Sequence, residues 1–227
     1  MKMKYVLMAV AAILMIGSVR AMTMTDLQSA IDAAESGGTV YVTSDISYDR
    51  ALVVTKSVTI ASAEGSSFTL TRDANYAAGT VVALATEGVN LTFANITIDG
   101  NKAAGKTRGV AVEISAGTVT LENGFVLRNF YSTIQGGGVH VHTAGHLVMN
   151  DGAVIRELEN DSYGVAVVIG SGKSTDAADF TMNGGLITGC VDHHASASDG
   201  YGGAVYLYGW NSTFRGKGGT IADNASD

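Results

Sequence analysis

A pattern of apolar and turn residues recurs along the chain at a nearly fixed spacing. In its clearest copy, Phe180 is followed by Met182, Gly185, Ile187 and Cys190 at two, five, seven and ten residues. Further copies lie 28 to 34 residues apart and begin at Leu91, Val119, Leu147 and Phe214. A repeat of this length is typical of proteins that stack one structural unit on the next.

Two positions of the repeat make specific predictions. The residues at position seven are predicted to form one interior column: Ile98, Val126, Val154, Ile187 and Ile221. The residues at position ten fall at a turn, where asparagine bonds to nearby backbone: Asn101, Asn129, Glu157, Cys190 and Asn224. Cys190 has no His or Lys beside it, so we interpret it as a small buried residue rather than a nucleophile.

A second short pattern lies between these copies and has a period of two residues. It reads GVAVEI, GGVHV, GVAVVI and GGAVYL. A period of two indicates a strand with one face turned inward. The predicted inward pairs are Val112/Ile114, Val139/Val141, Val167/Ile169 and Val205/Leu207.

These patterns predict an all-β chain in which each repeat supplies at least two short strands. A single unit cannot bury its own apolar face, but stacking on its neighbours can, which favours a parallel β-helix. The 29 glycines suit a chain that turns sharply several times per repeat, and the absence of proline suits strands paired on both sides. A single cysteine excludes an internal disulfide.

The first 21 residues resemble a secretory signal peptide. Lys2 and Lys4 precede a short apolar run, and small residues around Arg20 offer a cleavage site. Without these three cations the chain keeps 11 basic and 21 acidic residues, a net charge of −10. We therefore expect a secreted or cell-surface protein with no transmembrane segment in the mature chain and no nucleic-acid partner.

Residues 22–38 are predicted to carry a short helix that caps the first repeat. Thr25 is the expected N-cap and Gly37 the C-terminal stop, with Leu27 and Ile31 on one apolar stripe. Residues 39–227 are assigned to the repeats. Strands are expected at 39–43, 52–60, 67–70, 81–84 and 91–98, with a polar loop at 72–80.

Two stretches give a family resemblance. LQSAIDAAESGGTVYV (residues 27–42) and ALVVTKSVTIAS (residues 51–62) resemble the start of the pectin-lyase-like right-handed β-helix superfamily. FTMN from Phe180 and GGAV from Gly202 are similar to paired motifs of polymorphic outer-membrane proteins, and the repeats resemble secreted bacterial adhesin-like proteins. The resemblance implies a right-handed parallel β-helix, a scaffold that hosts lyases, hydrolases and non-catalytic adhesins alike.

The outward side chains of the second pattern are the best candidate site. If the inward pairs stack, Glu113, His140, Val168 and Tyr206 line up on the opposite face. The candidate ligand-binding residues are Tyr206, Tyr208, Trp210 and His142, because aromatic rings stack on the apolar faces of sugars. Glu113 and His140 are the candidate acid/base pair. Ordinary cross-strand pairing on a solvated face is the alternative for all of them.

Other polar groups point less directly to chemistry. His140, His142 and His146 fall at strand spacing but lack a fourth ligand in sequence, so no metal site is predicted. Asp192, His193, His194 and Asp199 lie in a polar segment that we interpret as a solvated insertion. Asp99 and Asp151 are interpreted as turn residues. We find neither the calcium-binding acids nor the paired carboxylates that lyases and hydrolases of this superfamily use, and we expect no cofactor.

These observations favour an adhesin-like module that binds carbohydrate or a host or matrix surface, with no catalytic constellation. A polysaccharide lyase or glycoside hydrolase of the same fold is the first alternative, and a purely structural stalk is the second. The printed sequence stops one turn after a repeat with no terminal cap, which led us to expect a fragment of a longer chain.

Overall fold

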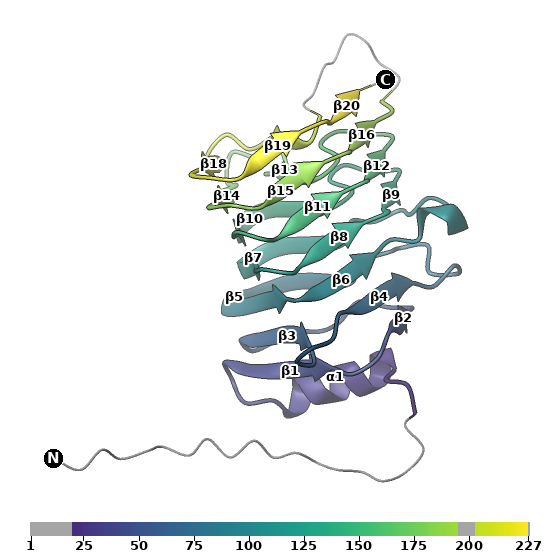
Figure 1. The fold of residues 1–227 in the computed structure, drawn as a ribbon. Coiled ribbons are helices and arrows are strands. Elements are labelled where there is room, and N and C mark those ends of the chain that lie inside the picture. Colours follow the sequence, from purple (N-terminus) through teal and green to yellow (C-terminus); the bar gives the residue numbers. More distant parts are fainter. Residues whose placement is uncertain (1–19, 195–202, 227) are drawn as a thin grey trace, which may run out of the picture.

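The computed structural model describes residues 20–194 and 203–226 (Figure 1). Most of the predicted signal peptide, together with Asp199 and Gly202, lies outside the described residues. The described part consists of parallel strands arranged in three sheets, with one α-helix at the N-terminal end. A single 3₁₀ turn, Lys102–Ala104, interrupts the strands.

The largest sheet, sheet A, follows the order β1 (Gly38–Val42), β3 (Val58–Ser62), β5 (Val82–Ala94), β7 (Val112–Leu121), β10 (Val139–Met149), β13 (Val167–Ile169) and β17 (Val205–Leu207). Two further strands continue it beside β10, namely β14 (Asp179–Met182) and β18 (Thr213–Gly216). Sheet B follows the order β2 (Ile46–Tyr48), β4 (Phe68–Arg72), β6 (Ile96–Asp99), β8 (Val126–Arg128), β11 (Val154–Arg156), β15 (Leu186–Thr188) and β19 (Thr220–Ala222). Sheet C contains β9 (Tyr131–Ser132), β12 (Glu159–Asn160), β16 (Val191–Asp192) and β20 (Ala225–Ser226).

From β7 onward the chain visits sheet A, sheet B and sheet C in turn and then returns to sheet A. We call one such pass a rung. Equivalent strands of successive rungs pair in parallel, so the rungs lie one above another in Figure 1. The stacked parallel sheets are consistent with a parallel β-helix.

The predicted inward pairs of sheet A are confirmed in register, and the first three pairs are also buried. Val112/Ile114, Val139/Val141, Val167/Ile169 and Val205/Leu207 align in register from strand to strand. The first residues of the repeat also align, in the order Leu91, Val119, Leu147, Phe180 and Phe214. All of these side chains are fully buried except three in the last rung, namely Val205, Leu207 and Phe214.

The predicted interior column of sheet B is wrong by one residue in two rungs. Val126 and Val154 align with Leu186 and are half-exposed. The buried column comprises Ile98, Leu127, Ile155 and Ile187, and Ile221 continues it into the last rung. The cause is turn length, because four residues separate Met149 from Val154 but only three separate Met182 from Leu186.

The predicted turn position shifts for the same reason. The residue after each of β8, β11, β15 and β19 takes a positive φ of 54° to 63°, and these residues are Asn129, Glu157, Gly189 and Asp223. Cys190 and Asn224 therefore fall one residue beyond the position predicted for them. Cys190 is fully buried, as predicted, and burial raises the pKa of its thiol to about 11.

The helix, α1 (Met24–Ala33), crosses the N-terminal end of the stack below β1 and β2 (Figure 1). Leu27 and Ile31 are buried against the core, as the apolar stripe predicts. The expected N-cap, Thr25, is wrong. The cap is Thr23, whose hydroxyl accepts the Asp26 N–H at 3.2 Å while the Asp26 carboxylate accepts the Thr23 N–H at 2.9 Å.

Three of the predicted strand boundaries also need correction. Residues 52–60 are not one strand, because Leu52 makes an isolated bridge to Val82 and the strand begins at Val58. The short strand β2 was missed. The strands expected at 81–84 and 91–98 are instead β5, which runs unbroken from Val82 to Ala94, and β6 after a turn at Asn95 with a φ of 46°.

The interior contains polar groups that the repeat pattern did not predict. Arg72, predicted to begin a polar loop, lies in β4 and is 2% exposed. Its guanidinium donates to four backbone carbonyls, those of Tyr76, Gly100, Asn101 and Gly105, at 2.6 to 3.2 Å. A buried cation requires such partners because it has lost its hydration.

Candidate functional site

The residues predicted to form the outward column of sheet A align in register. His140 lies between Glu113 and Val168 in register, and Tyr206 follows Val168 in the last rung. Val168, however, is fully buried rather than exposed. Gly164 packs on its side chain, since a Cβ there would lie 2.3 Å from a Val168 methyl group. Val168 therefore divides the column in two. We call the part with Glu113 and His140 the histidine part and the part with Tyr206 the tyrosine part.

The candidate acid/base pair, Glu113 and His140, does not form a hydrogen bond. Glu113 Oε1 instead lies 3.1 Å from Nε2 of His142, whose Nδ1 lies 3.0 Å from the Thr143 hydroxyl. His140 Nε2 lies 3.0 Å from the Gly170 carbonyl oxygen, which can only accept, so this nitrogen carries the proton. The rings of His140 and His142 are 4.7 Å apart.

The electrostatics of this group follow from these contacts. The hydrogen bond from His142 lowers the pKa of Glu113, so its carboxylate is ionised at neutral pH. Burial lowers the pKa of His140, so its imidazole is neutral there. His140 is thus neutral and bound to a carbonyl, whereas the Glu113 carboxylate is bound to His142. Glu113 and His140 therefore do not form an acid/base pair.

The tyrosine part is an aromatic cluster at the C-terminal end of sheet A. The rings of Tyr206 and Tyr208 are stacked, with centroids 5.4 Å apart and planes 20° apart. Tyr163 packs 5.9 Å from Tyr206. Tyr208 is 41% exposed and Trp210 is 83% exposed, which are high fractions for such large rings.

The backbone around the cluster determines how its rings lie. A Cβ at Gly172 would lie within 3.0 Å of the Tyr208 ring, so Gly172 lets that ring rest on the backbone. The Gly172 N–H donates to the Tyr208 carbonyl at 2.9 Å. Asn211, next to Trp210, donates from its side chain to the Ser174 carbonyl at 2.7 Å. The Tyr208 ring and the turn that carries Trp210 are thus both attached to residues 172–174.

The three histidines considered for a metal site diverge. His140 and His142 lie together, whereas His146 Nδ1 is hydrogen-bonded to Asp179 in the next rung. Asp179 also forms an ion pair with Arg215 at 3.5 Å. Within residues 20–194 and 203–226, no group of three or more His, Cys, Asp or Glu side chains is placed to hold a metal ion.

The segment beginning at Asp192 is not wholly solvated. Asp192 is 4% exposed, and its carboxylate accepts the His194 N–H at 2.9 Å. Burial raises the pKa of this carboxyl group. Ser132 and Asn160 align with it in sheet C, and each side chain likewise accepts the N–H two residues further on. These buried side chains therefore shape the turns that follow sheet C.

Asp99, interpreted from the sequence as a turn residue, forms the expected turn bond and one further contact. Asp99 accepts the Asn101 N–H at 2.8 Å, which is the expected turn bond. Asp99 is also paired with Arg128 of the next rung at 2.8 Å, so it is not isolated.

Sequence reasoning missed a set of ion pairs that connect distant rungs. Lys102 Nζ lies 2.7 Å from Glu159, whose other oxygen lies 3.2 Å from Nε2 of His193. Lys106 lies 2.8 Å from Asp161. Burial acts to raise the pKa of Glu159, but the bonds from Lys102 and His193 lower it overall. The two lysines are 55 and 57 residues from their partners and His193 is 34 residues from Glu159, so no local pattern could have revealed these pairs.

No protein-family model, no curated protein and no solved structure matches the chain. Among the described residues, no helix combines the length and apolar character needed to span a membrane.

Proposed function

We propose that this chain is a secreted or cell-surface, adhesin-like module, folded as a right-handed parallel β-helix of the pectin-lyase-like type, which binds carbohydrate through its aromatic cluster. The observation that carries the proposal is the exposure of Tyr208, whose ring stacks on Tyr206, and of Trp210 two residues further along the chain. The sequence resemblance and the stacked parallel sheets support the fold.

Exposed aromatic rings favour a sugar ligand for a physical reason. The apolar face of a pyranose can cover a ring, while the tyrosine hydroxyl and indole N–H remain available for hydrogen bonds. The Tyr208 ring, which rests on the backbone of Gly172, also loses little conformational entropy on binding. His142 contributes less in this proposal, because both of its ring nitrogens already have partners.

The proposal is tested by screening the purified chain on a glycan array and titrating the strongest ligands in solution. Trp210→Ala and Tyr208→Ala are expected to weaken binding by roughly tenfold or more, as for aromatic residues at the centre of other binding sites. Tyr41→Ala is the matched control, because Tyr41 is 56% exposed on the first strand of the same sheet.

Two results would contradict the proposal. Binding that is unchanged in both variants would exclude the aromatic cluster, and failure to bind any glycan would exclude a carbohydrate ligand. Incubation with acidic polysaccharides and calcium is a separate assay, in which reproducible cleavage would favour the lyase alternative over an adhesin-like module.

A further inference from the structure

Strand β10 contains one residue more than the strand beside it. The pairing of β10 with β7 shifts after Val141 and resumes at Ala144. His142 and Thr143 thus stand opposite a single residue of β7, Ser115, which makes a β-bulge. A bulge changes the direction in which its side chains point, and bulges are frequent beside active sites.

Thr143 in this bulge holds a backbone conformation that its own side chain disfavours. Its φ is 57°, and among the described non-glycine residues with positive φ it alone is β-branched. Its N–H donates to the buried Asp176 carboxylate at 3.1 Å, and its carbonyl accepts the Ala177 N–H at 2.6 Å. Strain of this kind persists only where the surroundings enforce it, and it concentrates at functional sites.

The bulge places three side chains in one hydrogen-bonded chain. The Thr143 hydroxyl lies 3.0 Å from Nδ1 of His142, and Nε2 of His142 lies 3.1 Å from Glu113 Oε1. The ionised Glu113 carboxylate can only accept, so Nε2 carries the proton. In the neutral imidazole, Nδ1 then has no proton and accepts from the Thr143 hydroxyl. Thr143 is exposed, so a substrate can reach its oxygen.

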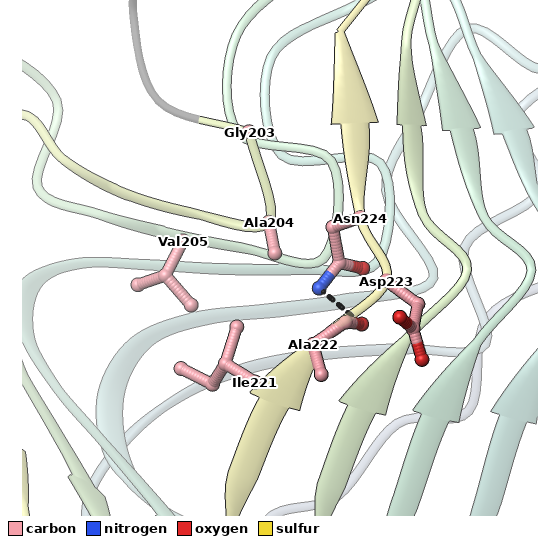
Figure 2. A pocket seen from close by; sticks show the side chains of 7 residues that line it. All are labelled: Gly203, Ala204, Val205, Ile221, Ala222, Asp223 and Asn224. Carbon is pink, nitrogen blue, oxygen red and sulfur yellow. Dashed lines mark hydrogen bonds between the residues drawn. The ribbon is translucent and has the colours of Figure 1, made fainter.

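We propose that Thr143, His142 and Glu113 form a hydrogen-bonded triad that cleaves carboxylic esters, such as O-acetyl groups carried on a larger molecule. Thr143 is the nucleophile, His142 is its base, and Glu113 orients the base. The proposal does not depend on the aromatic cluster. Figure 2 shows a pocket elsewhere in the molecule, whose described lining residues 203–205 and 221–224 include no hydroxyl, thiol or imidazole group, so no such triad forms there.

The reaction runs in two balanced steps. Thr143 Oγ attacks the carbonyl carbon of the ester while its proton passes to Nδ1 of His142. The bond from this carbon to the alcohol oxygen breaks, His142 returns the proton to that oxygen, and the acyl group remains on Thr143. Water then repeats the sequence, giving its proton to His142 and displacing Thr143 Oγ, which takes the proton back. The products are an alcohol and a carboxylic acid.

The first test follows the release of p-nitrophenol from p-nitrophenyl acetate by the purified chain. Thr143→Val and His142→Asn are each expected to slow release by roughly hundredfold, the contribution of a general base, whereas Thr143→Ser keeps the nucleophile and should retain activity. Thr120→Val is the matched control, because Thr120 is half-buried on the neighbouring strand β7. Release no faster than the uncatalysed reaction, or unchanged in Thr143→Val, would overturn the proposal.

The second test examines Glu113 as a positioning residue. The ¹⁵N chemical shifts of the His142 ring show which nitrogen carries the proton, and Nε2 is expected in the wild type. In Glu113→Gln the side-chain amide can donate to Nε2, so a share of His142 should carry the proton on Nδ1 and ester cleavage should slow by roughly tenfold or more. An unchanged tautomer or an unchanged rate would overturn this role.

The strain at Thr143 separates loss of activity from loss of the fold. Thr143→Gly removes the nucleophile, and glycine adopts a positive φ without strain. The variant is therefore expected to unfold at a urea concentration at least as high as the wild type, and to cleave the ester no faster than Thr143→Val. Ester cleavage retained in Thr143→Gly would overturn Thr143 as the nucleophile.

Discussion

At the residue scale, the interior depends on a few polar side chains that connect one rung to the next. Arg72 and Asp176 are the clearest cases, being 2% and 1% exposed. Neither forms an ion pair with an opposite charge among the described residues, and both bind chiefly to backbone groups. They specify the paths of two long loops, which apolar packing alone leaves undetermined.

We expect Arg72→Lys to destabilise the protein by about 3 kcal/mol or more. A single ammonium cannot reach four carbonyls that a planar guanidinium satisfies, and the bond to the Gly100 carbonyl is buried while the other three are partly buried. Urea unfolding measures the change in the free energy of unfolding. Arg156→Lys serves as the control, because Arg156 pairs with Glu157 at the surface and should lose about 0.5 kcal/mol or less. Equal effects of the two changes would contradict this role for Arg72.

We expect Asp176→Asn to lower stability most at neutral pH. Burial acts to raise the pKa of Asp176, but hydrogen bonds from Ser171, Lys173 and Thr143 lower it overall. A lowered pKa in the folded state stabilises the protein above the unfolded pKa of about 3.9 and loses that effect as the pH falls through the folded value.

The free energy of unfolding of Asp176→Asn is therefore expected to lie about 2 kcal/mol below that of the wild type above about pH 5. This difference should shrink below about pH 4. Urea unfolding at a series of pH values measures it. Asp151→Asn, at an exposed turn, is the matched control and should change little at any pH. If the difference in the free energy of unfolding stayed constant down to the lowest pH of the series, the stability of the loop would not depend on the charge of the Asp176 carboxylate.

At the scale of the elements, the sequence predicted the positions of several strands correctly but not which residues of neighbouring strands align. Alternation of apolar residues located β7, β10 and β13 and their inward faces, because a half-buried strand requires that period. The column through Leu127 and Ile155 was misplaced, since a repeat counted at fixed spacing cannot show that a turn has gained a residue. Arg72 and the pair of Lys102 with Glu159 were missed because their partners are distant in sequence.

The helix start gives a test at this scale. Thr23→Ala is expected to destabilise the protein by about 1 kcal/mol, because the hydroxyl that accepts the Asp26 N–H is lost. Thr25→Ala, at the position favoured by the sequence, loses a bond from Arg50 but leaves the cap intact, and its effect should be smaller. Thermal unfolding followed by circular dichroism compares the two. A larger effect at Thr25 would favour the sequence-based cap.

At the scale of the whole molecule, stability is expected to vary along the stack. Strands β7 and β10 pair with neighbours on both sides and surround fully buried side chains, whereas β19 and β20 pair on one side within the described residues. In a stacked repeat, each unit is stabilised by its neighbours, so a unit with one neighbour opens first.

Amide hydrogen exchange is therefore expected to be slowest in β7 and β10 and fastest in β19 and β20. Thr220–Ala222 should exchange through local opening of the last described rung, because this opening breaks contacts with one described neighbour. Strand β7 serves as the internal control, because it has a neighbouring strand on both sides. Uniform exchange along the stack would indicate that the rungs unfold as one cooperative unit, contrary to this expectation.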